Sequence, residues 1–170
     1  MKQFCIYTIV VFLVCCLSSC DYYLIEPHKE HVGHISYKHL FEKEEFPPCY
    51  SEKIFPYYYG RDHAGYEYGL DSLKTYLTDQ YNNFDNTSIT GYITIRFLIN
   101  CKGELGRFEV KSLGTDYKSK KLDKRVEQHL VSVIQSMEDW KPISFNEDEY
   151  DSFYHLTFKI INGDLEAILP

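Results

Sequence analysis

The sequence predicts an α+β fold, a two-layer sandwich in which two helices pack on a mainly antiparallel sheet. Residues 69–81 and 122–137 each carry apolar side chains at helical spacing. Residues 91–112 and 153–169 each contain two strand patterns separated by a tight turn. Helices that alternate with antiparallel strand pairs in this order are typical of an α+β sandwich, so we expect both helices on one face of the sheet.

The first helix is expected over 69–81, because its apolar residues recur every three or four positions with charged and hydroxyl residues between them. The apolar stripe consists of Leu70, Leu73, Leu77 and Tyr81. The polar run that starts at Asn82 ends this helix.

The first strand is expected over Gly91–Asn100, the stretch GYITIRFLIN, in which apolar and polar residues alternate. Side chains at every second position share one face of a strand. The apolar face consists of Ile93, Ile95, Phe97 and Ile99. Gly103 can adopt a positive φ in the turn that follows, and a second strand over about 105–112 then returns antiparallel.

The second helix, 122–137, has the clearest periodicity, and Pro142 ends it by disfavouring helical backbone at Lys141. Trp140 is expected to cover the end of the core, with contact to a partner as the alternative. The predicted core joins the helix to the sheet through Val126, Leu130, Val133, Ile134, Ile95, Phe97 and Phe158.

The last strand pair is expected over Phe153–Ile161 and Asp164–Leu169, because Asn-Gly, here Asn162–Gly163, is the strongest short hairpin signal. The acidic segment before it predicts a flexible, solvated loop, since the spacing of its carboxylates matches no calcium-binding loop. These carboxylates belong to Glu147, Asp148, Glu149 and Asp151.

The first 20 residues have the pattern of a bacterial lipoprotein signal. Lys2 precedes an apolar run from Phe4 to Leu17, which has the length of a signal-peptide core rather than of a membrane span. The sequence LSSC that ends at Cys20 matches a lipobox, so Cys20 is the predicted site of lipidation. An ordinary cleaved signal is the alternative.

The chain is therefore expected to consist of a signal peptide (1–19), a flexible membrane tether (20–64) and one domain (65–170). The tether is polar, interrupted by proline and without a sustained apolar period. Its histidines could line a helix as zinc or copper ligands, but Pro27 and Gly33 disfavour a helix, so we interpret them as solvated and predict no metal or other cofactor. They are His28, His31, His34 and His39.

Cys49 and Cys101 are the only cysteines that remain beside Cys20 once the signal is removed. An exported protein lies in an oxidising compartment, so a disulfide between them is the preferred interpretation and two separate buried thiols are the alternative. The disulfide would contribute roughly 4 kcal/mol on a chain-entropy basis.

Composition and motifs argue against several function classes. A net charge of -7 disfavours nucleic-acid binding, which requires clustered Lys and Arg. The sequence contains no phosphate-binding glycine loop, no HExxH zinc motif and no G-x-S-x-G nucleophile motif, so we predict a protein that is not an enzyme. His129 and His155 are expected to be structural.

Three stretches of the chain, in this order, resemble the C-terminal domain of TonB proteins. They are the strand pair GYITIRFLINCKGELGRFEV (Gly91–Val110), the helix end MEDWKP (Met137–Pro142) and the strand YHLTFKI (Tyr154–Ile160). The resemblance covers about 65–170 and looks closest to the TonB-like lipoproteins of Bacteroidetes-type bacteria.

This resemblance implies a binding domain of the cell envelope that faces the periplasm, where TonB proteins offer a sheet edge to a short peptide of an outer-membrane transporter. The candidate partner contacts that follow from it are Trp140, Phe158, Ile160 and Leu165. The chain lacks the family's transmembrane helix, and its final strand is expected to cover the binding edge. The alternative function is therefore a structural envelope lipoprotein that no longer binds transporter peptides.

Overall fold

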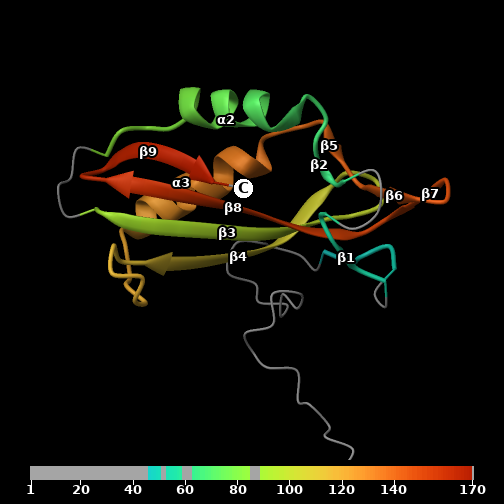
Figure 1. Ribbon diagram of the computed structural model, residues 1–170, viewed down its shortest axis with the longest axis horizontal. Helices are drawn as coiled ribbons and strands as arrows, with labels where there is room; N and C mark the ends of the chain where they lie inside the picture. Colours follow the sequence, from blue (N-terminus) through green and yellow to red (C-terminus); the bar gives the residue numbers. More distant parts are fainter. Residues whose placement is uncertain (1–45, 51–52, 59–62, 85–88, 170) are drawn as a thin grey trace, which may run out of the picture. The chain divides into compact units, whose positions relative to one another are not determined.

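The computed structural model describes residues 46–50, 53–58, 63–84 and 89–169, all within one unit of the chain, Val32–Pro170. Cys20, the tail histidines and the first part of the predicted tether lie outside the described residues. The described part combines two helices with an open, mainly antiparallel sheet, which confirms the α+β class (Figure 1).

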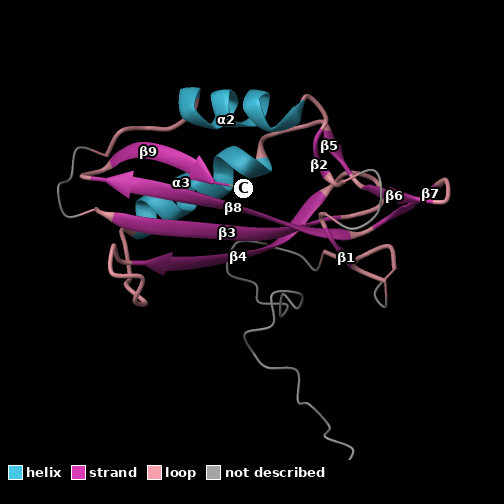
Figure 2. Ribbon diagram, in the orientation of Figure 1, coloured by secondary structure: helices cyan, strands magenta, loops and turns pink. Residues whose placement is uncertain are grey.

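The two helices lie where the periodicity predicts them, each shorter by a few residues. They are α2 (Gly69–Asp79) and α3 (Lys124–Gln135), drawn in cyan in Figure 2. Asp123 caps α3, since its carboxylate accepts a hydrogen bond from the Arg125 N–H at 2.9 Å.

The main sheet has the order β1-β8-β3-β4, with β9 also paired to β8. Its strands are β3 (Gly91–Ile99), β4 (Leu105–Leu113), β8 (Ser152–Ile161), β9 (Asp164–Leu169) and the short β1 (Phe55–Pro56). All pairs are antiparallel except β1 with β8.

The predicted hairpin at Asn162–Gly163 is confirmed, because β8 and β9 meet there with positive φ at both turn residues, 55° and 91°. Two consecutive positive φ values define the type I′ turn that joins strands most tightly. Gly103 has a φ of 77° in the predicted turn between β3 and β4.

One core joins both helices to the same face of the sheet. Every second residue of β3 from Ile93 to Ile99 lies in it, together with Leu73 and Leu77 of α2 and the apolar face of α3, and the seven predicted core residues are confirmed as members. Leu70 of the predicted α2 stripe is exposed instead. The helices therefore contribute to one layer against the sheet.

The boundary predicted at residue 65 is wrong, because residues 46–58 are part of the fold where the structure describes them. Phe46 and Ile54 pack against Leu98 and Phe153 on the sheet face opposite the helices, and β1 lies beside β8. The polar composition of this segment hid the few apolar residues that hold it.

The predicted acidic loop is also corrected, because it forms a hairpin of β6 (Ile143–Phe145) and β7 (Asp148–Tyr150). Asn146 and Glu147 take positive φ in its turn. A further short pair joins β2 (Gly65–Tyr66) to β5 (Trp140–Lys141). Asp151, which follows β7, is completely buried rather than solvated.

Candidate functional site

The outer edge of β8 is shared between two short strands that leave a gap. β3 pairs along one side of β8 as far as Ser152, so β1 and β9 must both use the other side. β1 pairs with Ser152 and Phe153, and β9 pairs with residues 157–161. The main chain of 154–156 therefore has no strand beside it on that side within the described residues.

Only one residue of this gap directs its main-chain groups outward. The carbonyls of Asp151 and Phe153 accept hydrogen bonds from the N–H groups of Phe55 and Tyr57, both at 3.0 Å. Residues two apart along a strand direct their N–H and C=O groups to the same side. His155 therefore directs its N–H and C=O toward the gap, and neither β1 nor β9 pairs with it.

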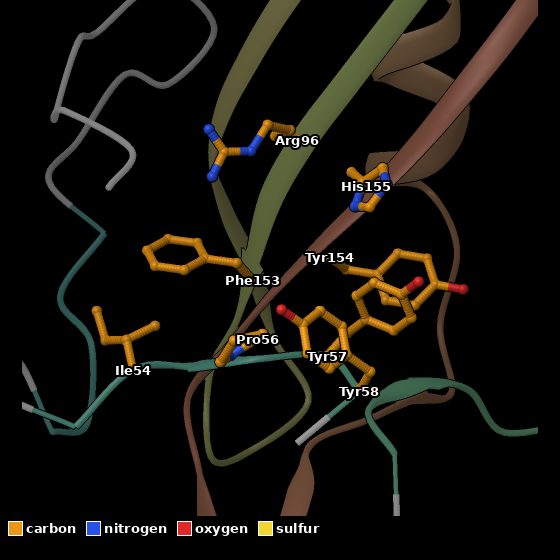
Figure 3. A pocket seen from close by; sticks show the side chains of 8 residues that line it. All are labelled: Ile54, Pro56, Tyr57, Tyr58, Arg96, Phe153, Tyr154 and His155. Carbon is orange, nitrogen blue, oxygen red and sulfur yellow. The ribbon is translucent and has the colours of Figure 1, made fainter. Parts of the chain in front are cut away.

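A pocket of about 110 Å³ lies beside this gap (Figure 3). β8 and β3 form one wall, and the segment around β1 crosses the other side. The pocket is lined by Ile54, Pro56, Tyr57, Tyr58, Arg96, Phe153, Tyr154 and His155. An apolar cavity of about 150 Å³ holds a benzene molecule, so this pocket has room for one side chain of moderate size.

Two basic groups of neighbouring strands lie at the upper rim of the pocket (Figure 3). Arg96 and His155 face each other as a cross-strand pair. Arg96 is buried and bonds Glu109 on β4 at 3.2 Å. Burial, and then the Arg96 charge, lower the pKa of His155 below its ordinary value.

Aromatic rings form most of the remaining wall of the pocket. The Tyr57 ring lies 5.0 Å from that of Tyr154 and 5.5 Å from that of His155, both in edge-on geometry. Burial raises the pKa of Tyr154, so its hydroxyl stays protonated at neutral pH. The pocket thus offers apolar faces with hydroxyl and imidazole groups at their margins.

The partner contacts expected from the resemblance do not lie at this surface. Phe158 and Ile160 are fully buried, and Trp140 is 5% exposed, so these three side chains belong to the core. Leu165 is partly buried against the same core. Phe158 and Trp140 thus take the core positions that the sequence predicts for them, and Ile160 lies beside Phe158 in the same core.

Cys49 and Cys101 form a disulfide, with their Cα atoms 6.0 Å apart. Beside it, the Asp151 carboxylate accepts hydrogen bonds from the N–H groups of Tyr50 at 2.8 Å and of Cys101 at 2.9 Å. The disulfide and this carboxylate together attach the segment before β1 to the β3–β4 turn and to β8.

Two residues of this region could not be recognised from the sequence. They are His155, whose main chain has no described strand beside it at the outer side of β8, and Asp151, whose buried carboxylate holds the segment before β1. His155 is one of several polar residues in an alternating strand, and Asp151 follows three other acidic residues, at 147–149. No local pattern marks Asp151, because the N–H groups that bond its carboxylate belong to Tyr50 and Cys101, 101 and 50 residues away in the chain.

Two further properties concern the described residues alone. One group of Cys, His, Asp or Glu side chains there is compact enough for a metal ion, namely Cys49, Cys101 and Asp151. None of the helices in this part has the length and hydropathy needed to cross a membrane.

Comparison of the chain with protein-family models, curated proteins and solved structures finds no match.

Proposed function

We propose that this protein is a lipid-anchored interaction module of the bacterial cell envelope, with a two-layer TonB C-terminal-like sandwich that binds an extended peptide by strand addition. The observation that carries the proposal is β1, an extended segment that already adds to the edge of β8. The anchor at Cys20 and the periplasmic orientation rest on the lipobox pattern, and the peptide of an outer-membrane transporter rests on the resemblance to TonB.

β1 covers only a short part of this edge. It is two residues long, and the N–H groups of Phe55 and Tyr57 donate to carbonyls at the beginning of β8 in addition to the pairing within the ladder itself. At about 0.5–1.5 kcal/mol net for each bond, loss of these two bonds alone costs roughly 1–3 kcal/mol, to which the ring contacts of Phe55 and Tyr57 add. A longer peptide can make the same bonds and add those of His155.

The side chains beside β1 define the partner's chemistry. Successive residues of a strand face opposite sides, and here Phe55 lies 5.4 Å from the Tyr150 ring while Pro56 lines the pocket. A suitable partner is therefore an extended segment with apolar side chains at neighbouring positions, one of them small enough for the pocket.

The proposal is tested by titrating a short peptide from an outer-membrane transporter into the full chain and two variants of the edge. His155→Pro removes the outward N–H and is expected to abolish binding, whereas His155→Gln keeps the N–H and is expected to bind like the parent chain. Far-UV circular dichroism and a urea midpoint establish that the variants are folded.

A third variant tests the role of β1 as a competitor. Phe55→Pro removes the N–H that donates to the main-chain carbonyl of Asp151, so β1 competes less well for the edge. The peptide is therefore expected to bind about two- to tenfold more tightly, which is the effect of one hydrogen bond. Equal binding by His155→Pro and His155→Gln would place the peptide elsewhere.

The coverage of β8 favours a second candidate function. β9 covers residues 157–161 and β1 covers Ser152 and Phe153, which leaves little edge for a partner unless β1 moves. A structural envelope lipoprotein of the same fold would have this property. Failure of both the parent chain and Phe55→Pro to bind peptide would support it.

A further inference from the structure

Asp151 is the most deeply buried charged residue in the described part of the chain. Its side chain is completely buried, and its two oxygens accept hydrogen bonds from the N–H groups of Cys101 and Tyr50. Buried charges in proteins are generally paired with an opposite charge or coordinate a metal. Among the described residues, no Lys, Arg or His forms an ion pair with Asp151.

The sulfur atoms beside Asp151 give this charge a candidate partner. Both Sγ atoms and one carboxylate oxygen lie within 4.8 Å of one another. Tetrahedral zinc, with Zn–S of about 2.3 Å and Zn–O of about 2.0–2.2 Å, separates two sulfur ligands by about 3.8 Å and a sulfur from an oxygen by about 3.5 Å. Opening of the S–S bond and small shifts of the three side chains would bring these atoms to the separations of zinc ligands.

We propose that reduction of the Cys49–Cys101 disulfide converts this cluster into a zinc site with two thiolates and Asp151 as protein ligands. An external dithiol transfers two electrons and two protons to the disulfide and leaves as its own cyclic disulfide, so that both cysteines become thiols. Zinc then binds both sulfur atoms and releases the two thiol protons to water.

The electrostatics of the cluster explain why a cation belongs there. Two thiolates beside a buried carboxylate would repel one another, so the reduced pair has to keep its protons or bind a cation. A zinc ion offsets two of the three negative charges. Thiolates select zinc over magnesium or calcium, which prefer oxygen ligands alone.

The surroundings leave space for the fourth ligand. The disulfide lies in an open groove of about 470 Å³ between the segment at 46–50 and the β3–β4 turn. A carboxylate oxygen has two lone pairs, so Asp151 can ligate zinc while it still accepts its main-chain hydrogen bonds. A water molecule in the groove completes the tetrahedron.

Cobalt titration of the reduced chain tests this site, because tetrahedral Co²⁺ with thiolate ligands shows intense charge-transfer and visible bands. The full chain is used with the other cysteines replaced by serine, so that Cys49 and Cys101 are its only thiols. A phosphine reductant opens the disulfide before metal is added. One Co²⁺ per reduced chain is expected, with displacement by one Zn²⁺ and no binding after reoxidation.

Three variants assign the ligands. Cys49→Ser is expected to lose the charge-transfer band, and Asp151→Asn to weaken metal binding at least tenfold. Glu147→Gln removes an exposed carboxylate of the neighbouring β6–β7 turn and is the matched control that binds like the parent.

X-ray absorption at the zinc edge of the parent chain gives a readout that does not depend on any variant being folded. Two sulfur ligands and two oxygen or nitrogen ligands are expected. Absence of metal binding by the reduced parent, equal binding by the oxidised chain, or a coordination shell without sulfur would overturn the proposal. So would unchanged binding by folded Asp151→Asn.

Discussion

Asp151, just before β8, and His155, within β8, lie close together in the chain but have different surroundings. Asp151 is fully enclosed and accepts two main-chain hydrogen bonds beside the disulfide. His155, four residues later, is partly buried between Arg96 and Tyr57 and directs its main chain into a gap of the sheet. Burial and strand register, as well as residue type, determine these two roles.

The stability of the domain is expected to depend on pH through His155. Its pKa is lowered in the folded state by burial and by Arg96, so the unfolded chain binds the proton more readily. The free energy of unfolding is therefore highest above the ordinary His pKa of about 6.5 and falls as the pH drops below it, until the folded-state pKa is passed.

Urea denaturation at several pH values between about 5 and 7.5 measures this effect. His155→Gln has no imidazole to protonate and is expected to lose less stability over the same interval. If the parent and this variant lose equal stability, another group is responsible for the pH dependence.

At the scale of the element, one apolar face of α3 fixes the position of this helix on the sheet. Its residues Val126, Leu130 and Ile134 are almost completely buried against the sheet, while Asp123 satisfies an N–H at its first turn. Burial of this face, rather than intrinsic helix propensity, provides most of the stability of such a short helix.

Leu130→Ala is expected to lower the free energy of unfolding by about 2–5 kcal/mol, the range for a leucine that fills a core site. The control is Gln128→Ala on the exposed side of α3, with an expected change within about 0.5 kcal/mol. Urea denaturation of both variants gives the comparison. A loss below about 1 kcal/mol for Leu130→Ala would mean that the core collapses to fill the cavity.

At the scale of the whole molecule, a crosslink holds a segment from outside the predicted domain onto the sheet. The disulfide spans 52 residues, β1 follows it on the edge of β8, and Phe46 and Ile54 cover apolar residues of the sheet. Attachment of this segment is thus shared between a covalent bond, a buried carboxylate and a small apolar cluster.

Replacement of both Cys49 and Cys101 by serine is expected to lower the free energy of unfolding by roughly 4 kcal/mol, the chain-entropy value for a loop of this length. The Phe55 and Tyr57 amides, which bond β8, should then exchange hydrogen much faster than those of β3. Unchanged protection of these two amides would show that the carboxylate and apolar contacts suffice to hold β1.

Cys20→Ser tests the predicted anchor of the whole chain. Without a thiol at the lipobox, the protein is expected to remain unprocessed or to leave the membrane fraction. Detergent partitioning and the mass of the processed chain measure the two outcomes. Normal processing with unchanged partitioning would exclude lipidation at this cysteine.

Local pattern in the sequence determined the helices, the long strands and their turns. The stripe of α3, the alternation of β3 and the Asn162–Gly163 turn each depend on residues close together in the chain. The seven core residues could be predicted for the same reason, since periodicity identifies the apolar face of each element.

Tertiary structure alone decided what lies at the edges of the sheet. β1 joins β8 across almost a hundred residues and is too short to have a strand pattern of its own. The choice between core and partner contact for Ile160 depends on which face the helices cover, and alternation identifies an apolar face without saying whether a helix or a partner covers it. The open position at His155 and the carboxylate beside the disulfide exist only because segments distant in sequence end next to each other in space.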